Sequence, residues 1–515
     1  MKRNKQLIYI LVATTMLAGG CRKFLKERSQ DEMTPQTVAS LSELLAKEGY
    51  PYVASSSTAT DGFVFCNFLN MLDDDVHMMN RDPTYVQPYA RPFYVWSDKP
   101  YEEISNIAYG AQTSRNPYQQ LYNRIRGCNV VMDMLNDVSG TQEQKEQLEG
   151  EALTLRTYYY FMLANLYGRP YNDKVNKNTT SLAVPILRTG GVAEKPLPRN
   201  TVKEVYDMMV SDIERAAGLL EKNKKISTVY RISYRSAWLM ASRIFLHMEQ
   251  WDKVLSYTNK LIEDYPLLTD LNTWKTPMAQ SLFTAANTPI IGTSNVEILF
   301  LFSNSRGGDM QIYYQPPITP VLIASNELID LYETDDMRYT PFITNPSPNF
   351  YLTKSNGYYT GSKVNGLSEG GRCFRMSEAY VNRAEAIIRK AMAGDGNVSL
   401  QAALDDLNYL RGRRFKAGSP NAIVTLASLN NDPAKVFDFY QKERRREFCF
   451  EEFRWFDLRR YGQPQLVHTF NPNEPVVTNP SLPVETYTLP QGSNRYVMKF
   501  PPSVLEANPL LIPNP

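Results

Sequence analysis

The segment that most restricts the fold is residues 235–266, RSAWLMASRIFLHMEQWDKVLSYTNKLIEDYP. It contains two stretches with the apolar spacing of an amphipathic helix, separated by a short polar break and closed by a proline. Large and small side chains alternate along both stretches, at Trp238, Ala241, Ser242, Phe245, Trp251, Val254, Thr258 and Leu261. Such alternation lets one helix pack closely on another. The segment therefore predicts a helical hairpin inside a larger helical protein.

This pattern resembles a tetratricopeptide repeat, although Ser242 replaces the usual glycine, Val254 the usual alanine and Thr258 an aromatic residue. One repeat alone leaves an apolar face uncovered, so further helix pairs must stack on it. We predict a second pair in residues 376–414 and a more degenerate third pair in residues 118–167.

Two more helices follow from the same spacing. Residues 142–167 place apolar side chains at steps of three and four, and Gly168 ends the run. Thr201 is the expected N-cap of the next helix. In contrast, residues 61–116 and 267–372 are irregular, apart from the strand-like run VEILFLFS, and the tail after residue 462 is proline-rich and extended. Long insertions on a helical scaffold are common places for binding sites.

The N-terminus predicts export. A basic start, MKRNKQ, precedes a twelve-residue apolar stretch and the small residues AGG, which is the pattern of a secretory signal. Cys21 follows as in a bacterial lipobox, although Leu17 lies one place earlier than usual and Gly19-Gly20 replaces the common Ala/Ser-Gly. We expect an acylated Cys21 that anchors the chain in membrane lipid. The alternative is a plain secretory signal with a chance cysteine.

Composition argues against two classes of protein. The 56 basic and 54 acidic residues leave a formal net charge of only +2, so we expect no nucleic-acid partner. The remaining cysteines show neither CxxC spacing nor a nearby histidine cluster, which argues against zinc. We expect buried thiols at Cys66, Cys128, Cys373 and Cys449.

Two short motifs could carry chemistry. GLSEG at 366–370 matches a nucleophile elbow, but polar loop residues stand where a strand and a helix are required. A surface hydrolase, using His77, His247 or His468 as base, therefore remains only an alternative. The run Asp73-Asp74-Asp75 could bind a cation or a hydroxyl-rich ligand, yet it lacks the glycine and the terminal glutamate of a calcium loop. A structural turn is the competing interpretation.

The segment ERRREFCFEEFRWFDLRRYG near the C-terminus combines charged and aromatic residues. One continuous helix would align Glu443, Glu447 and Glu451, with Arg444 and Arg454 in reach of them. The interleaved acids would repel phosphate as often as the arginines attract it. Because guanidinium groups bind carboxylates in two-pronged bonds and stack on rings, we interpret the segment as a charged and aromatic seam inside the scaffold.

The same segment resembles the C-terminal signature of the SusD/RagB family of outer-membrane nutrient-binding lipoproteins. Further pieces agree in order along nearly the whole chain after Cys21: FLKE, RTYYYFMLANLYGRP, TVKEVYDMMVSDIERAAGLL, RISYRSAWLMASRIFLHMEQWDKV, ETDDMRYTPFI, RMSEAYVNRAEA, ALDDLNYLRGRR and YVMKFPPSVLEANPLLIPNP. The last piece departs from the family pattern, because FPP stands where Pro-Ile-Pro is common.

The resemblance implies a SusD-like fold, which is mainly α, with tetratricopeptide-type helix pairs and a long irregular ligand-binding region with little β structure. It implies a lipoprotein signal peptide at 1–20, an N-terminal helical region at 21–265 and a C-terminal RagB/SusD region at 266–515. Members are not enzymes and use no cofactor. They are lipid-anchored at the outer membrane, facing outward, and pass glycan or peptide ligands to a SusC-like TonB-dependent barrel transporter.

By analogy with the family, we expect the ligand contacts in the two irregular segments. Sugars stack their CH faces on aromatic rings and bind carboxylate and guanidinium groups through their hydroxyls. The residues expected to do this are Asp73, Arg81, Tyr94, Trp96, Trp274, Tyr313 and Tyr314. A core or turn role is the alternative for each residue. For the whole chain, a surface glycosidase or esterase and a periplasmic scaffold without a small ligand are the alternatives.

Overall fold

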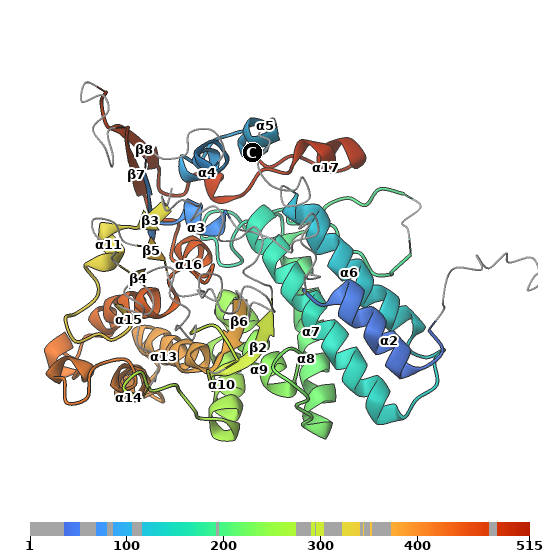
Figure 1. Cartoon of the computed structure of the whole chain (residues 1–515), viewed down its shortest axis with the longest axis horizontal. Coiled ribbons are helices and arrows are strands. Elements are labelled where there is room, and N and C mark those ends of the chain that lie inside the picture. Colours follow the sequence, from blue (N-terminus) through green and yellow to red (C-terminus); the bar gives the residue numbers. More distant parts are fainter. Residues whose placement is uncertain are drawn as a thin grey trace, which may run out of the picture.

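The computed structural model describes residues 35–51, 68–79, 86–105, 116–191, 195–273, 290–293, 295–302, 322–339, 343–344, 351–352, 372–472 and 482–515. Helices dominate these ranges, and the strands form three small sheets (Figure 1). The fold is therefore mainly α, as predicted. None of the helices in these ranges combines the length and hydropathy that a membrane-spanning segment needs.

The scaffold is a row of long helices in which each helix packs on the next (Figure 1). Its members are α6 (Pro117–Met134), α7 (Gln142–Tyr167), α8 (Val202–Asn223), α9 (Tyr234–His247), α10 (Trp251–Asp264), α13 (Met376–Met392) and α14 (Leu400–Gly412). Local signals set the helix ends. Capping boxes at Thr141 and Thr201 begin α7 and α8, and α7 ends at Gly168. These bounds confirm the helices predicted at 142–167 and after Thr201.

The predicted hairpin at 235–266 is confirmed as α9 and α10. Trp238, Phe245 and Val254 are buried, as the repeat pattern requires. Thr258, which replaces an aromatic residue, is also buried, and its hydroxyl donates to the Val254 carbonyl oxygen at 2.8 Å. The other two predicted pairs form as α13–α14 and α6–α7. Because α10 packs directly on α13, the row continues across the long insertion between them.

The irregular segments contain more regular structure than predicted. The described part of the first segment holds α3 (Leu69–Leu72), β1 (Val76–Met79), α4 (Val86–Tyr94) and α5 (Pro100–Ser105). The tail forms β7 (Leu466–Asn471), β8 (Glu485–Leu489) and α17 (Pro502–Ala507). These elements are too short for sequence periodicity to reveal them, and long-range strand pairing stabilises the strands.

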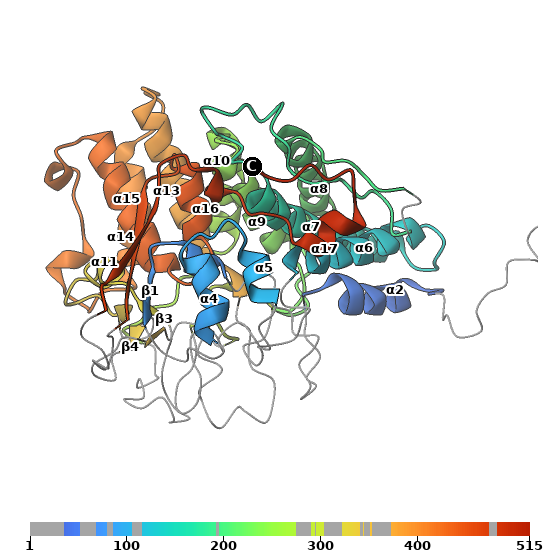
Figure 2. The same cartoon turned by 90° about the horizontal axis from the view of Figure 1, so that it is seen from above.

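The largest sheet joins three distant parts of the chain in the order β3-β1-β7-β8, with β3 at Leu322–Ala324 and β1 parallel to β7. The predicted strand is confirmed as β2 (Ile298–Phe302), which pairs with β6 (Arg372–Arg375). The remaining α-helices and strands are α2 (Val38–Leu44) with a π-helical extension (Leu45–Gly49), α11 (Asn326–Ile329), β4 (Ile343–Thr344), β5 (Tyr351–Leu352), α15 (Pro433–Phe448) and α16 (Arg454–Arg460). Figure 2 shows α4, α5, β1 and β3 on one side of the helical row.

The charged C-terminal segment forms α15, a break, and α16 rather than one helix. Phe450 and Glu452 in the break have φ angles of 61° and 66°, a left-handed conformation that a helix cannot accommodate. Glu451 therefore does not continue the line of Glu443 and Glu447, and the prediction of a single helix was wrong. The interpretation as a buried seam is confirmed, because both glutamates of α15 are fully buried.

The arginine partners of the seam come from distant parts of the chain. Glu447 accepts hydrogen bonds from Arg338 at 3.1 Å, Arg375 at 2.5 Å and Arg414 at 2.9 Å. Burial alone would raise the pKa of Glu447, but Arg414, Arg375 and Arg338 hold it well below its usual range. Three separate segments must therefore reach one carboxylate for the charge to be tolerated inside the protein.

Glu443 also accepts hydrogen bonds from three arginines, Arg338, Arg411 and Arg446, at 2.6 to 2.7 Å. The partners predicted within the segment were wrong. Arg444 donates instead to Asp457 at 2.6 Å, and Arg454 donates to an aspartate near the other end of the chain.

We predict that Glu447→Gln lowers the free energy of unfolding by about 3–5 kcal/mol, because it leaves buried guanidinium groups without their counter-charge. Urea unfolding followed by circular dichroism measures the change. Glu221→Gln is the matched control, since Glu221 forms an exposed pair with Lys260 and should cost less than about 1 kcal/mol. Equal losses in the two variants would contradict the central role of Glu447.

Candidate functional site

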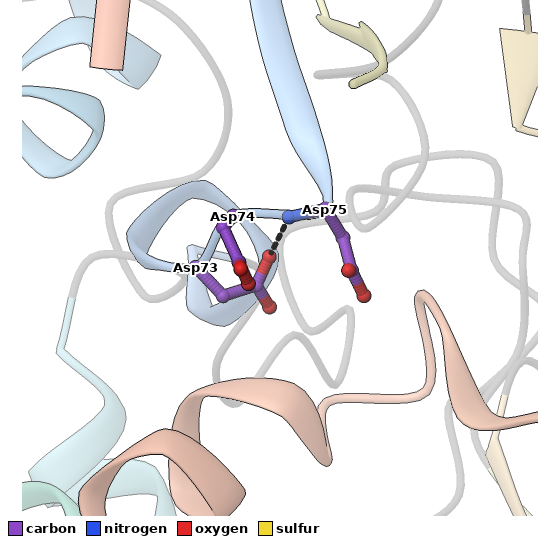
Figure 3. Close-up of side chains that lie close together, drawn as sticks. All are labelled: Asp73, Asp74 and Asp75. Carbon is purple, nitrogen blue, oxygen red and sulfur yellow. Dashed lines mark hydrogen bonds between the residues drawn. The ribbon is translucent and has the colours of Figure 1, made fainter. Parts of the chain in front are cut away.

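The candidate site is built on the turn between α3 and β1, where Asp73, Asp74 and Asp75 follow one another (Figure 3). Their carboxylates offer ligand atoms within 4.8 Å of one another. The Asp75 N–H donates to Asp73 Oδ1 at 2.9 Å, which tightens the turn. Asp73 and Asp75 are fully buried, whereas Asp74 is partly exposed.

Two arginines of the seam bind this turn. Arg454 donates to both carboxylate oxygens of Asp74, at 2.7 and 2.8 Å. Arg445 donates to Asp75 Oδ1 at 2.7 Å and to the main-chain oxygen of Asp74 at 2.6 Å. Although burial opposes ionisation, these two guanidinium groups lower the pKa of Asp74. They also place positive charge beside Asp74 and Asp75, which weakens the attraction of these two carboxylates for a cation.

Asp73 differs from Asp74. Burial raises its pKa well above the usual range, and the charges of Asp75 and Asp74 raise it further. Its Oδ2 atom makes no hydrogen bond within the described ranges. A carboxyl group in this position favours its protonated form, so Asp73 is a weak acceptor for an incoming ligand unless the surroundings change.

The aromatic candidates Tyr94 and Trp96 lie at the end of α4. Their rings stack on the two sides of the His468 imidazole from β7, with centroid distances of 4.2 and 4.1 Å. The Tyr94 hydroxyl donates to the Thr469 carbonyl oxygen at 3.0 Å, and Trp96 Nε1 donates to that of Leu72 at 2.9 Å. Because Tyr94 is 1% exposed and Trp96 3% exposed, neither ring presents a face to solvent in this structure.

The structure therefore brings three of the predicted ligand contacts, Asp73, Tyr94 and Trp96, into one buried cluster. The other four lie outside the described residues, as do the lipidation site, one cysteine and the elbow motif: Arg81, Trp274, Tyr313, Tyr314, Cys21, Cys66 and residues 366–370. All seven ligand contacts remain predictions. The cysteines that the structure describes, Cys128, Cys373 and Cys449, are buried thiols as predicted.

Sequence reasoning missed His468, Arg445 and Arg454 as partners of the turn. No local pattern signals these contacts, since more than 300 residues separate the partners. The only available signal was chemical: an acidic run and an arginine-rich run in one chain with nearly balanced charge.

Comparison with known proteins agrees with this architecture. A family model described as starch-binding associating with outer membrane matches residues 23–246, and the SusD family model matches residues 330–515. The chain belongs to the SusD/RagB family. A SusD-like protein of Formosa agariphila is 23% identical over 414 residues, which cover 71% of this chain and 77% of that protein.

Solved structures share the fold of this SusD/RagB chain. A SusD superfamily protein of Bacteroides thetaiotaomicron has a TM-score of 0.67 at 20% identity, covering 93% of this chain and all of that one (100%). A SusD-like carbohydrate binding protein of Bacteroides vulgatus has a TM-score of 0.64 at 19% identity, covering 92% and 97% of the two chains. The predicted SusD-like fold is confirmed.

We predict opposite effects from neutralising two neighbouring aspartates. A raised folded-state pKa contributes stability at low pH that is lost as pH rises, so Asp73→Asn should stabilise the protein at pH 7.5 and change little at pH 4. The lowered pKa of Asp74 has the reverse sign, so Asp74→Asn should destabilise at pH 7.5. Urea unfolding at both pH values measures this, and a loss of stability from Asp73→Asn at pH 7.5 would refute the assignment.

Proposed function

We propose that this chain is a cell-surface lipoprotein that binds oligosaccharide without altering it and delivers it to a SusC-like TonB-dependent outer-membrane transporter. Family membership in both halves of the chain carries the proposal. The description of one matching model as starch-binding, and of a similar structure as carbohydrate binding, supports a glycan as the ligand.

The arrangement of the scaffold supports a binding role. A surface that captures a polymer gains affinity when its groups are held in place before the ligand arrives. Here the buried seam fixes the α3–β1 turn through Arg445 and Arg454. The turn after α3, α4 and the strands β3, β7 and β8 lie close together (Figure 1). The protein thus has a rigid base from which ligand-binding segments can extend.

We propose two roles for the predicted site residues. Arg81, Trp274, Tyr313 and Tyr314 contact the ligand directly, in the irregular segments. Asp73, Tyr94 and Trp96 belong to the base of the same surface, where their burial means that a ligand would reach them only after the groups above them move. Modest affinity suits this role, because the ligand must leave again for the transporter.

Two of the three histidines support binding over hydrolysis. His247 is buried in α9, and burial, with Arg460 and Arg444 nearby, lowers its pKa well below the usual range. Both ring nitrogens of His468 face main-chain carbonyl oxygens of the protein itself. Neither imidazole is placed to take a proton from a nucleophile on a bound substrate.

We predict that the full chain binds members of a glycan array and that Trp274→Ala weakens binding about tenfold or more, as expected for loss of one stacking ring. Trp251→Ala is the matched control, since Trp251 lies in the scaffold helix α10. Isothermal titration with the best array ligand measures both variants. If the chain binds peptides and no glycan, the ligand is a peptide. Release of reducing ends or acetate would overturn the proposal in favour of a hydrolase.

We predict that Cys21→Ser moves the protein from the membrane fraction to the soluble fraction, because it removes the site of acylation. Fractionation and intact mass measurement of the wild-type and variant chains test this. A TonB-dependent barrel protein should co-purify with the wild-type chain. Wild-type protein that carries no lipid, or that purifies without any barrel, would contradict the anchor or the transporter partner respectively.

A further inference from the structure

A shallow, partly open pocket lies where the α4–α5 region meets residues 495–499 of the C-terminal tail. Its floor is apolar and includes Phe93 of α4 and Val497 and Met498 of the tail. These three side chains are at most 5% exposed. The Met498 N–H donates to the Leu166 carbonyl oxygen at 2.8 Å, which holds the tail against the end of α7. The floor of the pocket is therefore preformed.

The rim of the pocket is polar and carries two cations, Arg495 and Lys499. Lys499 Nζ donates to the main-chain oxygen of Asn514 at 3.1 Å. Within the part of the chain that the structure describes, it forms no ion pair with a carboxylate. A carbonyl oxygen takes one of the three N–H groups of an ammonium but leaves its charge uncompensated. Lys499 thus presents positive charge to a ligand in the pocket.

Arg495 is paired, but it keeps a donor for a second acceptor. Its Nε and Nη2 atoms donate to the two carboxylate oxygens of Asp98, each at 2.9 Å. The two side chains are 42% and 62% exposed, and exposed ion pairs contribute little to stability. Nη1 makes no hydrogen bond to another described residue. Arg495 can therefore bind an incoming anion while it keeps Asp98.

Two carboxylates stand beside the rim without lining the pocket. Asp98 is bound by Arg495, and Glu103 accepts a hydrogen bond from the Ser97 hydroxyl. The charged residues that line the pocket are both basic. An apolar floor below a positive rim fits a ligand that is apolar on one face and anionic at one edge.

We propose that this pocket binds a sugar ring that carries a carboxylate, and that the glycan captured by the protein therefore contains uronic acid. The CH face of the ring packs on the apolar floor, and the carboxylate binds Lys499 Nζ and Arg495 Nη1. Hydrogen bonds between charged partners are about twice as strong as neutral ones, so the rim favours an acidic sugar over a neutral one. The inference rests on the proposed glycan-binding role and names the class of glycan.

The first test compares three small probes on the full chain by ligand-observed NMR: methyl glucuronide, methyl glucoside and sodium acetate. We expect the glucuronide to bind about tenfold or more tightly than the glucoside, because only its carboxylate reaches the two cations. Acetate should bind more weakly than the glucuronide, since it lacks the CH face. Equal affinity for the two glycosides, or no binding of either, would overturn the proposal. Acetate binding as tight as that of the glucuronide would indicate an adventitious ion only and would also overturn it.

The second test assigns the binding to this pocket. Lys499→Gln removes the charge but keeps an N–H donor for the Asn514 carbonyl oxygen, so it should weaken glucuronide binding about tenfold and leave glucoside binding unchanged. Lys416→Gln is the matched control, because Lys416 is exposed in the loop after α14, and it should change neither affinity. Circular dichroism checks that both variants are folded. Unchanged glucuronide affinity in Lys499→Gln would refute the site.

The results also separate this inference from the proposed function. If the glycan array shows binding of neutral glycans alone, the acidic class is wrong and glycan binding stands. If the glucuronide binds through Lys499 but no barrel protein co-purifies with the chain, the pocket stands and delivery to a transporter is contradicted.

Discussion

The structure depends on the carboxylate of Glu447, which three arginines from three separate segments share inside the protein. A charge in a low-dielectric interior is tolerated only when its partners are in place. Arg338 follows α11, Arg375 lies in β6, and Arg414 follows α14. The seam can therefore form only when these elements have assembled around α15. Arg243 of α9 and Glu378 of α13 add a second buried pair, with two bonds of 2.6 and 2.7 Å. Electrostatic pairing thus holds the helical row together where the long insertion interrupts it.

The same segment also orders the aspartate turn between α3 and β1. Arg445 and Arg454 bind the aspartate turn, and His468 joins that turn to α4. The scaffold and the candidate site are therefore one connected network rather than a rigid core with an independent surface. Removing a charge from the seam or from the aspartate turn should therefore weaken the hydrogen bonds that join the two. Fold alone does not specify a ligand, so this network does not by itself identify which glycan is bound.

Tyrosine, which is frequent in this chain, is used differently from what its chemistry first indicates. Tyr94 places its ring on His468 and its hydroxyl on a main-chain carbonyl oxygen. Tyr50 and Tyr159 are also buried and bind Glu151 and the Gly49 carbonyl oxygen. An amphipathic ring that suits a sugar also suits a core in which apolar packing must coexist with polar groups. Composition therefore cannot separate a ligand-binding aromatic residue from a structural one.

The sequence by itself determined the long helices, because caps such as Thr201, the stop at Gly168 and the helical spacing of residues 235–266 act within a few residues. It also determined the family and the mainly α fold, through pieces that agree in order. Only the tertiary structure decided the partners of Glu447, the break at Phe450 and the cluster around His468. These depend on contacts between residues far apart in the chain, and a carboxylate has many possible arginines in a sequence with 56 basic residues. Burial restricts the choice, because a carboxylate stays charged inside the protein only where arginine side chains reach it.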